Sequence, residues 1–189
     1  MTDSGITYRK AKLTDVPALA RLVDDSARGL SHQDYSGSQI EAAIGTVWGV
    51  DEELIRDSTF FLAEVTHDKS TGVNKKKIVG CGGWSKRTKL FGASTMNEMS
   101  DLLNPDIDAS RIRAFFVHPD WARKGIGKKI ITLCEIEARQ AGFKRMELMA
   151  TLPGYRLYRA CGYLGDSHVE CGSNANNAHL CVSMHKDLV

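Results

Sequence analysis

The sequence predicts an α/β fold, a single domain in which a mixed central sheet is flanked by helices. Apolar segments typical of strands alternate along the chain with segments whose apolar residues recur at helical spacing. A strand, a loop and a helix follow one another in the middle of the chain, as in units that place strands in parallel. The chain has 189 residues, of which 42% are hydrophobic, and this suits one domain with one sizeable core.

The first half of the chain begins with a strand and a helix. Residues 6–9 are a candidate strand. Thr14 and Asp15 then start a helix, and its apolar face carries Val16, Leu19, Leu22 and Val23. A polar loop over residues 31–37 separates this helix from two shorter helical segments, which we expect at residues 40–48 and 52–56.

A hairpin and an irregular segment follow. Residues 59–65 and 77–84 are apolar and rich in β-branched or aromatic side chains, which predicts two antiparallel strands joined by the polar residues 67–76. Residues 86–110 have no regular period and carry several turn formers, so we expect an irregular excursion there. A loop of that length either serves the function or is disordered.

The second half of the chain has a more regular pattern. Residues 112–117 form an apolar strand that ends at His118 and Pro119, and a helical period then runs to Gly142. Further along, residues 145–150 predict a strand and residues 155–160 a short helix, and residues 178–184 predict a last strand.

Composition and charge exclude several classes of function. The formal net charge of +2 gives no argument for binding nucleic acid or an anionic membrane. The first ten residues lack an apolar signal core, and no segment approaches the roughly 18 apolar residues of a membrane span. The five cysteines are odd in number and lack CxxC spacing, which argues against disulfides and a zinc site. We therefore predict a cytoplasmic protein with reduced thiols, no metal, and neither nucleic acid nor membrane as a partner.

The stretch HPDWARKGIGKK places Gly125 and Gly127 between a strand and a helix, among Arg123, Lys124 and Lys128. The first amides of a helix have no acceptor within the helix, and the helix dipole favours negative charge beside them. Glycines permit positive φ and remove side chains that would keep a ligand away, so a pyrophosphate could lie on the backbone. The same two glycines fit a plain strand-to-helix turn equally well.

Two familiar phosphate-binding motifs do not fit this stretch. A P-loop requires GxxxxGK[ST], but Ala122 stands at its first glycine and Lys129 at its hydroxyl position. A Rossmann turn requires GxGxxG, but Ile130 stands at its third glycine. The sequence outside the glycines therefore has to identify the ligand.

Two segments, FFVHPDWARKGIGKKI and LYRACGY at residues 157–163, resemble the two signatures of the GCN5-related N-acetyltransferase (GNAT) superfamily. The order of elements along the chain is also similar to the family's fold, a mixed, mostly antiparallel sheet flanked by helices. The resemblance implies that residues 1–189 form one N-acetyltransferase domain. It places the acetyl-CoA-binding core at about residues 111–163 and the acceptor-side elements at about 14–58 and 85–110.

The resemblance implies where acetyl-CoA, the acetyl donor, would bind. Main-chain amides would surround its pyrophosphate at Arg123, Lys124, Gly125, Ile126, Gly127 and Lys128. The pantetheine arm would lie along the strand at Phe115, Phe116 and Val117, where the Val117 amide could stabilise an oxyanion on the thioester. Two positions depart from the family's pattern: Ala122 replaces an Arg or Gln, and Thr151 replaces an Asn on the coenzyme side.

Tyr158 is the tyrosine of the second signature, and the resemblance implies that it is the general acid for the departing thiolate. Proton transfer from a phenol of pKa near 10 to a thiolate of pKa about 8.5 is unfavourable by roughly 2 kcal/mol. A hydrogen bond from the phenol to the sulfur could therefore suffice to stabilise the departing thiolate. Without the signature, a buried core aromatic would be the simpler interpretation of Tyr158.

The general base that deprotonates the acceptor amine stays open. Glu147, His118 and a chain of ordered water are candidates, although an exposed His or a strand Glu is more often structural.

The acceptor is also open. Arg111 and Arg113 could bind a carboxylate on it or form surface ion pairs, and three aromatic residues could line its pocket or simply pack, namely Tyr35, Trp48 and Trp84. A small molecule is favoured over a protein as the acceptor, and a homodimer remains open.

The sequence thus predicts an acetyl-CoA-dependent N-acetyltransferase that acts on a primary amine by direct attack. A covalent acetyl-enzyme is disfavoured because Cys161 is the one cysteine within the two signatures, and no neighbour would activate its thiol. Two alternatives remain: a noncatalytic acyl-CoA-binding or sensing module on the same fold, and an unrelated phosphate- or nucleotide-binding regulator.

Overall fold

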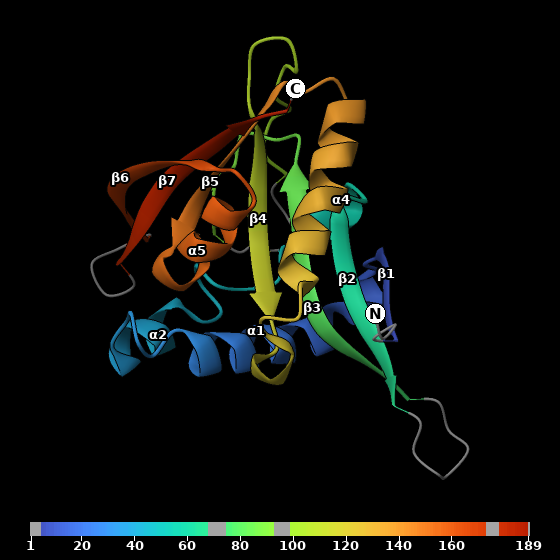
Figure 1. The fold of residues 1–189 in the computed structure, drawn as a ribbon, viewed down its shortest axis with the longest axis vertical. Coiled ribbons are helices and arrows are strands. Elements are labelled where there is room, and N and C mark those ends of the chain that lie inside the picture. The colour runs from blue at the N-terminus through green and yellow to red at the C-terminus, as the bar shows by residue number, and fades with distance from the viewer. Residues whose placement is uncertain (1–4, 68–74, 93–98, 173–177, 189) are drawn as a thin grey trace.

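The computed structural model of the chain describes residues 5–67, 75–92, 99–172 and 178–188. Seven strands form one sheet in the order β1-β2-β3-β4-β5-β7-β6, and helices cover both of its faces (Figure 1). The predicted mixed α/β fold is therefore confirmed. Most of the expected hairpin loop and the middle of the expected excursion, residues 68–74 and 93–98, lie outside the described residues.

The first half of the chain contains β1 (Ile6–Lys10), η1 (Leu13–Asp15), α1 (Val16–Leu30), α2 (Gly37–Ala43), α3 (Glu52–Arg56), β2 (Phe60–His67) and β3 (Lys75–Ser85). The strands, α1 and α3 lie close to where the sequence pattern predicts them. The prediction for α2 was wrong in its bounds, because the helix begins three residues earlier and ends before Trp48. Ser36 sets this start, since its hydroxyl accepts a hydrogen bond from the Gln39 amide at 3.2 Å.

The second half contains β4 (Ser110–Val117), η2 (Pro119–Trp121), α4 (Ile126–Gln140), β5 (Arg145–Thr151), α5 (Leu152–Ala160), β6 (Leu164–Cys171) and β7 (His179–Asp187). The sequence pattern did not predict β6. This strand lies at the edge of the sheet with most of its side chains exposed, so it lacks the alternation of apolar residues that marks a half-buried strand. Backbone pairing with β7 holds it in place.

The sheet opens between β4 and β5. Every other pair of neighbouring strands is antiparallel, whereas β4 and β5 run parallel and pair only at Ser110↔Met146 and Arg111↔Glu147. Beyond these positions the two strands diverge toward their carboxyl ends (Figure 1). One edge of β4 is therefore left without a strand partner over most of its length.

The two faces of the sheet are packed by different helices. On β2, Phe61, Ala63 and Val65 pack with the apolar residues of α4 and α5, while Phe60 and Leu62 alternate with them and pack with α1 and α3. This alternation is what a strand that is buried on both faces requires. α4 and α5 thus share one face of the sheet, and α1 and α3 lie on the other.

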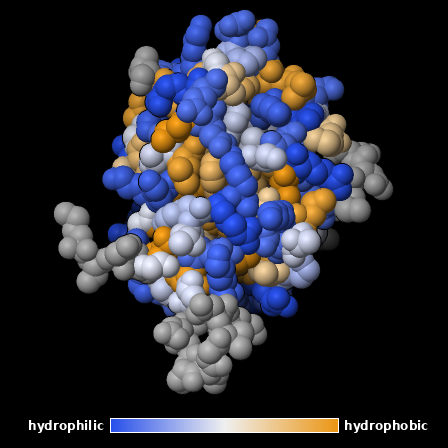
Figure 2. Space-filling view, turned by 90° about the vertical axis from the view of Figure 1, so that its right-hand side faces the viewer, coloured by the Kyte–Doolittle hydropathy of each residue, from blue (hydrophilic) through white to orange (hydrophobic). Residues whose placement is uncertain are grey.

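In Figure 2, hydrophobic side chains form small separate groups among hydrophilic ones. Among the described residues, no helix combines the length and the apolar character needed to cross a bilayer.

Candidate functional site

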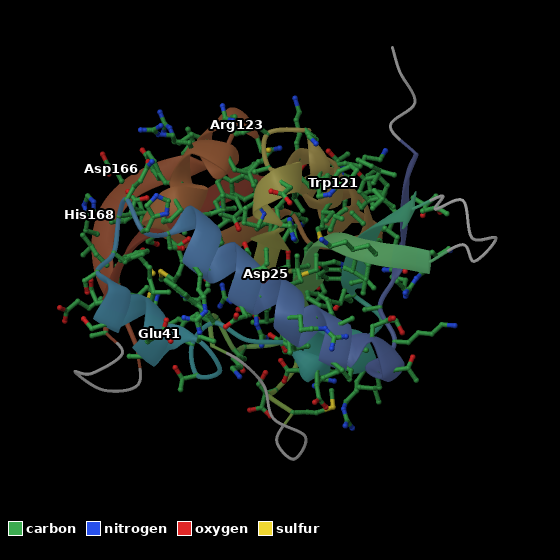
Figure 3. All side chains as sticks on the ribbon, turned by 90° about the horizontal axis from the view of Figure 1, so that it is seen from below. Asp25, Glu41, Trp121, Arg123, Asp166 and His168 are labelled. Carbon is green, nitrogen blue, oxygen red and sulfur yellow. The ribbon has the colours of Figure 1, made fainter. Side chains whose placement is uncertain are left out.

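A cavity of about 730 Å³ lies at the open end of the gap between β4 and β5. Ser26, Ala27 and Leu30 of α1 form one side of it. Trp121 and Arg123 lie on the other side, as the view from below shows (Figure 3). The cavity brings together most of the residues that the sequence singled out, namely Phe115, Phe116, Val117, Arg123, Gly125, Ile126, Gly127, Lys128, Thr151 and Tyr158.

Lys124 is the predicted binding residue that does not line the cavity. Its ammonium lies 4.4 Å from the centroid of the Trp121 ring, in cation–π contact with it. Of the three cationic residues predicted to bind, Arg123 and Lys128 therefore line the cavity and Lys124 does not.

The glycine turn joins η2 to α4 through two residues with positive φ, Arg123 at 63° and Gly125 at 82°. A Cβ on Gly125 would meet no atom within 4 Å, so glycine is needed there for its backbone conformation and not for packing. The Lys129 amide donates to the Gly125 carbonyl at 3.0 Å and closes the first turn of α4. The amides that precede Lys129 in the helix then have no acceptor within it, as at any helix start.

Gly127 is required for a different reason. It is buried in α4, and a Cβ at this position would lie 2.8 Å from Cδ2 of Leu157 in α5. Gly127 therefore lets the first turn of α4 approach the helix that carries Tyr158. The sequence alone treated the two glycines as equivalent, because the contact with Leu157 joins segments that are distant in the chain.

A β-bulge lies on the side of β4 that pairs with β3. Along the β3–β4 pair the register passes from Cys81↔Phe116 to Gly83↔Arg113, so β4 carries one extra residue, and Ala114 adopts a φ of 56°. The Phe115 ring lies across Gly82, where a Cβ would come within 2.7 Å of it. Gly82 thus leaves room for an aromatic side chain on the cavity wall.

Glycines also set how closely the helices approach the end of β4. A Cβ on Gly80 of β3 would lie 2.5 Å from Cγ2 of Ile126, the first residue of α4. A Cβ on Gly29 of α1 would lie 2.3 Å from Cγ of Pro119, which follows β4. The start of α4 and one face of α1 are therefore held close to the open edge of the sheet.

Tyr158 lies on α5 at the wall of the cavity and is 7% exposed. Its ring makes edge contacts with Phe115 and Tyr163, with centroid distances of 6.1 and 5.9 Å. Burial raises the pKa of the Tyr158 hydroxyl above its ordinary value near 10, so the phenol is neutral at physiological pH. The side chain can therefore donate a hydrogen bond toward the cavity.

Neither side chain that was considered as a general base lines the cavity. Glu147 forms an ion pair with Arg111 across the β4–β5 ladder. His118 accepts a hydrogen bond from the Asp120 amide through Nδ1 at 3.2 Å, and its Nε2 lies 3.0 Å from Nζ of Lys77. Both side chains serve local contacts in this structure.

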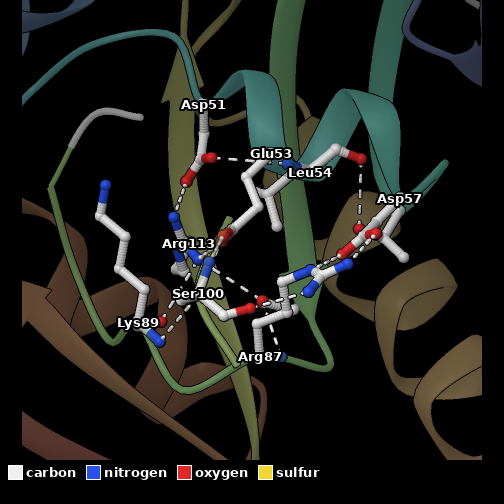
Figure 4. Close-up of polar contacts among 10 residues, drawn as sticks. Asp51, Glu53, Leu54, Asp57, Arg87, Lys89, Ser100 and Arg113 are labelled. Atoms are coloured by element: carbon white, nitrogen blue, oxygen red, sulfur yellow. Dashed lines mark hydrogen bonds and ion pairs between the residues drawn. The ribbon is translucent and has the colours of Figure 1, made fainter. Parts of the chain in front are cut away.

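Arg113 lies in a buried network of charges and not on the surface (Figure 4). Its guanidinium pairs with Asp51 and Glu53, and these three side chains are each at most 2% exposed. Burial raises the pKa of Asp51. Burial also acts to raise the pKa of Glu53, but hydrogen bonds from the Ser100 amide and from Arg113 outweigh it, so that the pKa of Glu53 falls below its usual range.

The same network attaches the excursion after β3 to α3. Glu53 accepts hydrogen bonds from the amide and hydroxyl of Ser100 at 2.7 and 2.9 Å, and Arg113 donates to the Lys89 carbonyl at 3.3 Å. Leu90 and Phe91 follow directly and line the cavity. The excursion thus contributes an apolar wall, which its irregular sequence did not indicate.

The three aromatic residues that were candidates for a pocket have different positions. Trp48 lines the cavity, and its indole donates to Nε2 of His179 at 3.2 Å. Tyr35 lies behind this pair, with a hydroxyl that donates to the Leu180 carbonyl at 2.6 Å and accepts from the Leu152 amide at 2.9 Å. Trp84 instead packs beneath α4 and donates to Glu137 at 3.0 Å.

His179 is a cavity residue that the sequence did not reveal, because it lies in the predicted last strand without any motif around it. No group of three His, Cys, Asp or Glu side chains suited to a metal ion occurs in the described part of the chain.

A scan against protein families finds one match to this chain. The model for the acetyltransferase (GNAT) family matches residues 30–163, which include the glycine turn and Tyr158. The comparison with curated proteins finds no match.

Solved structures share the fold at low sequence identity. A GCN5-related N-acetyltransferase from Rhodopseudomonas palustris is 20% identical, with a TM-score of 0.66 over 99% of this chain and 98% of that one. PaiA N-acetyltransferase from Thermoplasma acidophilum, solved with coenzyme A, is 15% identical, with a TM-score of 0.62 over 96% and 98%. YncA from Salmonella typhimurium, solved with its cofactor acetyl-CoA, is 15% identical, with a TM-score of 0.59 over 98% and 95%.

Proposed function

Because this chain belongs to the acetyltransferase (GNAT) family, we propose that it transfers the acetyl group of acetyl-CoA to a primary amine by direct attack. One observation carries the proposal: the amide-rich start of α4, the unpaired edge of β4 and Tyr158 all face one cavity. The coenzyme-bound state of two proteins with this fold supports it further.

In this proposal the start of α4 holds the pyrophosphate of acetyl-CoA. Main-chain amides do most of the binding, so the replacement of the family's Arg or Gln by Ala122 removes only a side-chain contact. Arg123 and Lys128 add positive charge at the cavity wall. Lys124 would attract the phosphates through the electrostatic potential around the turn, without lining the cavity. Thr151, at the start of α5, lies at the far wall of the same cavity.

The pantetheine arm would then lie along the open edge of β4, beside Phe115, Phe116 and Val117. An extended chain of amides can pair with an unpaired strand edge much as another strand would. The divergence of β4 and β5 leaves space for such a chain.

The acetyl transfer has a simple electron balance. The amine nitrogen forms a bond to the thioester carbon, and the carbonyl π electrons move to oxygen. The oxygen electron pair then re-forms the C=O bond as the C–S bond breaks, and the sulfur leaves with the electrons of that bond. The nitrogen, which is positively charged after attack, gives its extra proton to solvent. Tyr158 donates a hydrogen bond to this thiolate; because its pKa is raised by burial, complete proton transfer from the phenol to sulfur is uphill, and solvent supplies the proton in the end.

Direct attack is favoured over a covalent acetyl-enzyme. Cys161 does not line the cavity, and burial raises the pKa of its thiol, which disfavours the nucleophilic thiolate. Cys171 and Cys181 line the cavity at its β6–β7 wall, so they are the thiols to monitor. Mass spectrometry after incubation with acetyl-CoA alone should show no acetylated cysteine, and an acetyl group on either thiol would contradict direct attack.

We further propose that the whole chain acts as one domain, with the coenzyme core at about residues 111–163. The elements at about 14–58 and 85–110 would then receive the acceptor, which we propose to be a small molecule. Leu90, Phe91 and Trp48 on the cavity wall support an acceptor with an apolar portion next to its amine.

The test is a panel of primary amines incubated with acetyl-CoA, with free thiol as the readout. Thiol release that depends on one class of amine would support the proposal. Calorimetry with acetyl-CoA, CoA and ATP should accompany it. Tight ATP binding without CoA binding would contradict the proposal, and CoA binding without turnover of any amine would favour the noncatalytic acyl-CoA module.

A further inference from the structure

The open edge of β4 has a second hydrogen-bonding group beside it, the hydroxyl of Ser26 on α1. The Val117 amide donates to Oγ of Ser26 at 3.2 Å, and the two residues are 91 positions apart in the chain. The next amide, that of His118, donates instead to the Val79 carbonyl of β3 at 3.0 Å. Since amides alternate in direction along a strand, the Val117 amide points away from β3 and into the gap.

Ser26 is placed there by the packing of α1. Gly29, one helical turn further on, lets the same face of α1 contact Pro119 directly after β4. Ser26 itself is 6% exposed and lines the cavity. The position is therefore built by close contact between α1 and the end of β4.

The hydroxyl of Ser26 has bonding capacity left over. It accepts from Val117, but it donates no hydrogen bond to any residue that the structure describes. A serine inside a helix commonly donates to the carbonyl four residues earlier, and Ser26 does not. A buried donor without a protein acceptor, at the wall of a cavity, is suited to an oxygen atom of a ligand.

We infer that Ser26 is a further catalytic residue, whose hydroxyl joins the Val117 amide in stabilising the oxyanion that forms on the thioester. This inference rests on the proposed acetyl transfer. The two donor atoms lie 3.2 Å apart, so one oxygen atom can lie within hydrogen-bond distance of both. As negative charge develops there, the Val117 amide donates to the thioester oxygen in place of Ser26. The Ser26 hydroxyl donates a second hydrogen bond to the same oxygen.

The simpler interpretation is that Ser26 only satisfies the buried Val117 amide. The two interpretations differ in what removal of the hydroxyl changes. A structural bond affects the fold of β4 and hence coenzyme binding, whereas an oxyanion donor acts on the transition state and affects kcat.

The experiment uses the full chain and the best amine from the panel. We expect Ser26→Ala to lower kcat by about 100-fold, as for loss of one oxyanion donor. The KM for acetyl-CoA should change less than about threefold, and CoA binding by calorimetry should stay at the wild-type value. Ser26→Thr, which keeps a hydroxyl, should recover most of kcat. Ser26→Cys keeps the shape of the side chain but offers a weak donor, so it should lose most of kcat even if Ser26→Ala folds poorly.

Thr59→Val is the matched control. Its hydroxyl is also buried and donates to a backbone group, the Leu54 carbonyl at 3.3 Å, but it lies outside the cavity and outside the segments proposed to bind either substrate. This variant should keep the wild-type kcat.

Four results would overturn the inference. They are an unchanged kcat in Ser26→Ala and Ser26→Cys, loss of CoA binding in folded variants, failure of Ser26→Thr to recover activity, and an equal loss in Thr59→Val. If instead the wild type binds no CoA and releases no thiol with any amine, the proposed function itself fails, and the role of Ser26 fails with it.

Discussion

Tyr158 owes its protonation state to its place on α5. The rings of Phe115 and Tyr163 surround it, and burial disfavours the charged phenolate. A neutral phenol can donate a hydrogen bond, whereas a phenolate cannot. The proposed role of Tyr158 therefore depends on the apolar packing around it as much as on its position in the sequence.

Tyr158→Phe should slow turnover and largely spare CoA binding, because it removes one donor without changing the packing. The raised pKa keeps Tyr158 protonated above its ordinary range, so its own ionisation removes no activity between about pH 7 and about pH 10. The ratio of wild-type to variant kcat should therefore be constant over this interval. A ratio that falls steadily through pH 9, or turnover that is unchanged in the variant, would contradict the assignment.

Gly125 is the residue on which the proposed coenzyme cradle depends most directly. Its φ of 82° lies in a region that a β-branched residue rarely adopts, so Gly125→Val should distort the turn and abolish CoA binding. Calorimetry measures this loss. Gly142→Val is the control. Gly142 follows the other end of α4 with a φ of 94°, so valine there introduces comparable backbone strain away from the cavity. Equal loss of CoA binding in both variants would attribute the effect to general destabilisation.

At the scale of elements, the site exists because α4 and α5 meet above a divergent pair of strands. The gap between β4 and β5 exposes strand backbone, and α4 begins at the end of that gap. The contact between Gly127 and Leu157 sets the distance between the cradle and the helix that carries Tyr158. Cradle and tyrosine are thus coupled through one close helix–helix contact.

Gly127→Ala should push α5 away from α4, because its Cβ would lie 2.8 Å from Leu157. We expect kcat/KM for acetyl-CoA to fall by about tenfold or more, since small misplacements of reacting groups are costly. Adding Leu157→Ala makes room for the new methyl group, so the double variant should be more active than Gly127→Ala. If the loss in the double variant equals the sum of the losses in Gly127→Ala and Leu157→Ala, the contact does not couple the helices.

At the scale of the whole molecule, the buried charges on the α3 face join α3, β4 and the segment after β3. Arg113 of β4 reaches Asp51 and Glu53 beside α3, and the residues after β3 attach to the same group (Figure 4). The sequence raised the hypothesis that Arg113 binds an acceptor carboxylate. Its two protein carboxylates favour a structural role for the guanidinium, although Arg113 also lines the cavity.

Arg113→Ala should destabilise the protein by about 3–5 kcal/mol, because it leaves two buried carboxylates without their partner. Urea unfolding measures this change. Arg145→Ala is the control: its ion pair with Asp187 is exposed, at 52% and 61%, and its loss should cost less than about 1 kcal/mol. A fully stable Arg113→Ala protein with a raised KM for the acceptor would instead support carboxylate recognition.

The sequence by itself determined most of the elements and the positions of the two signatures. Periodicity placed α1, α4 and the strands other than β6, because the spacing of apolar residues reflects burial within one segment. The glycine turn and Tyr158 were identifiable for a similar reason. Each depends on a short, contiguous stretch in which the combination of residue types is specific.

Only the tertiary structure decided what depends on contacts between distant segments. The approach of Leu157 to Gly127, the burial of Arg113 against Glu53 and the position of Ser26 beside Val117 each join elements that are far apart in the chain. β6 likewise needs β7 beside it to be a strand. Such contacts leave no pattern in the sequence, because neither residue of a pair is distinguished by its own neighbours in the chain.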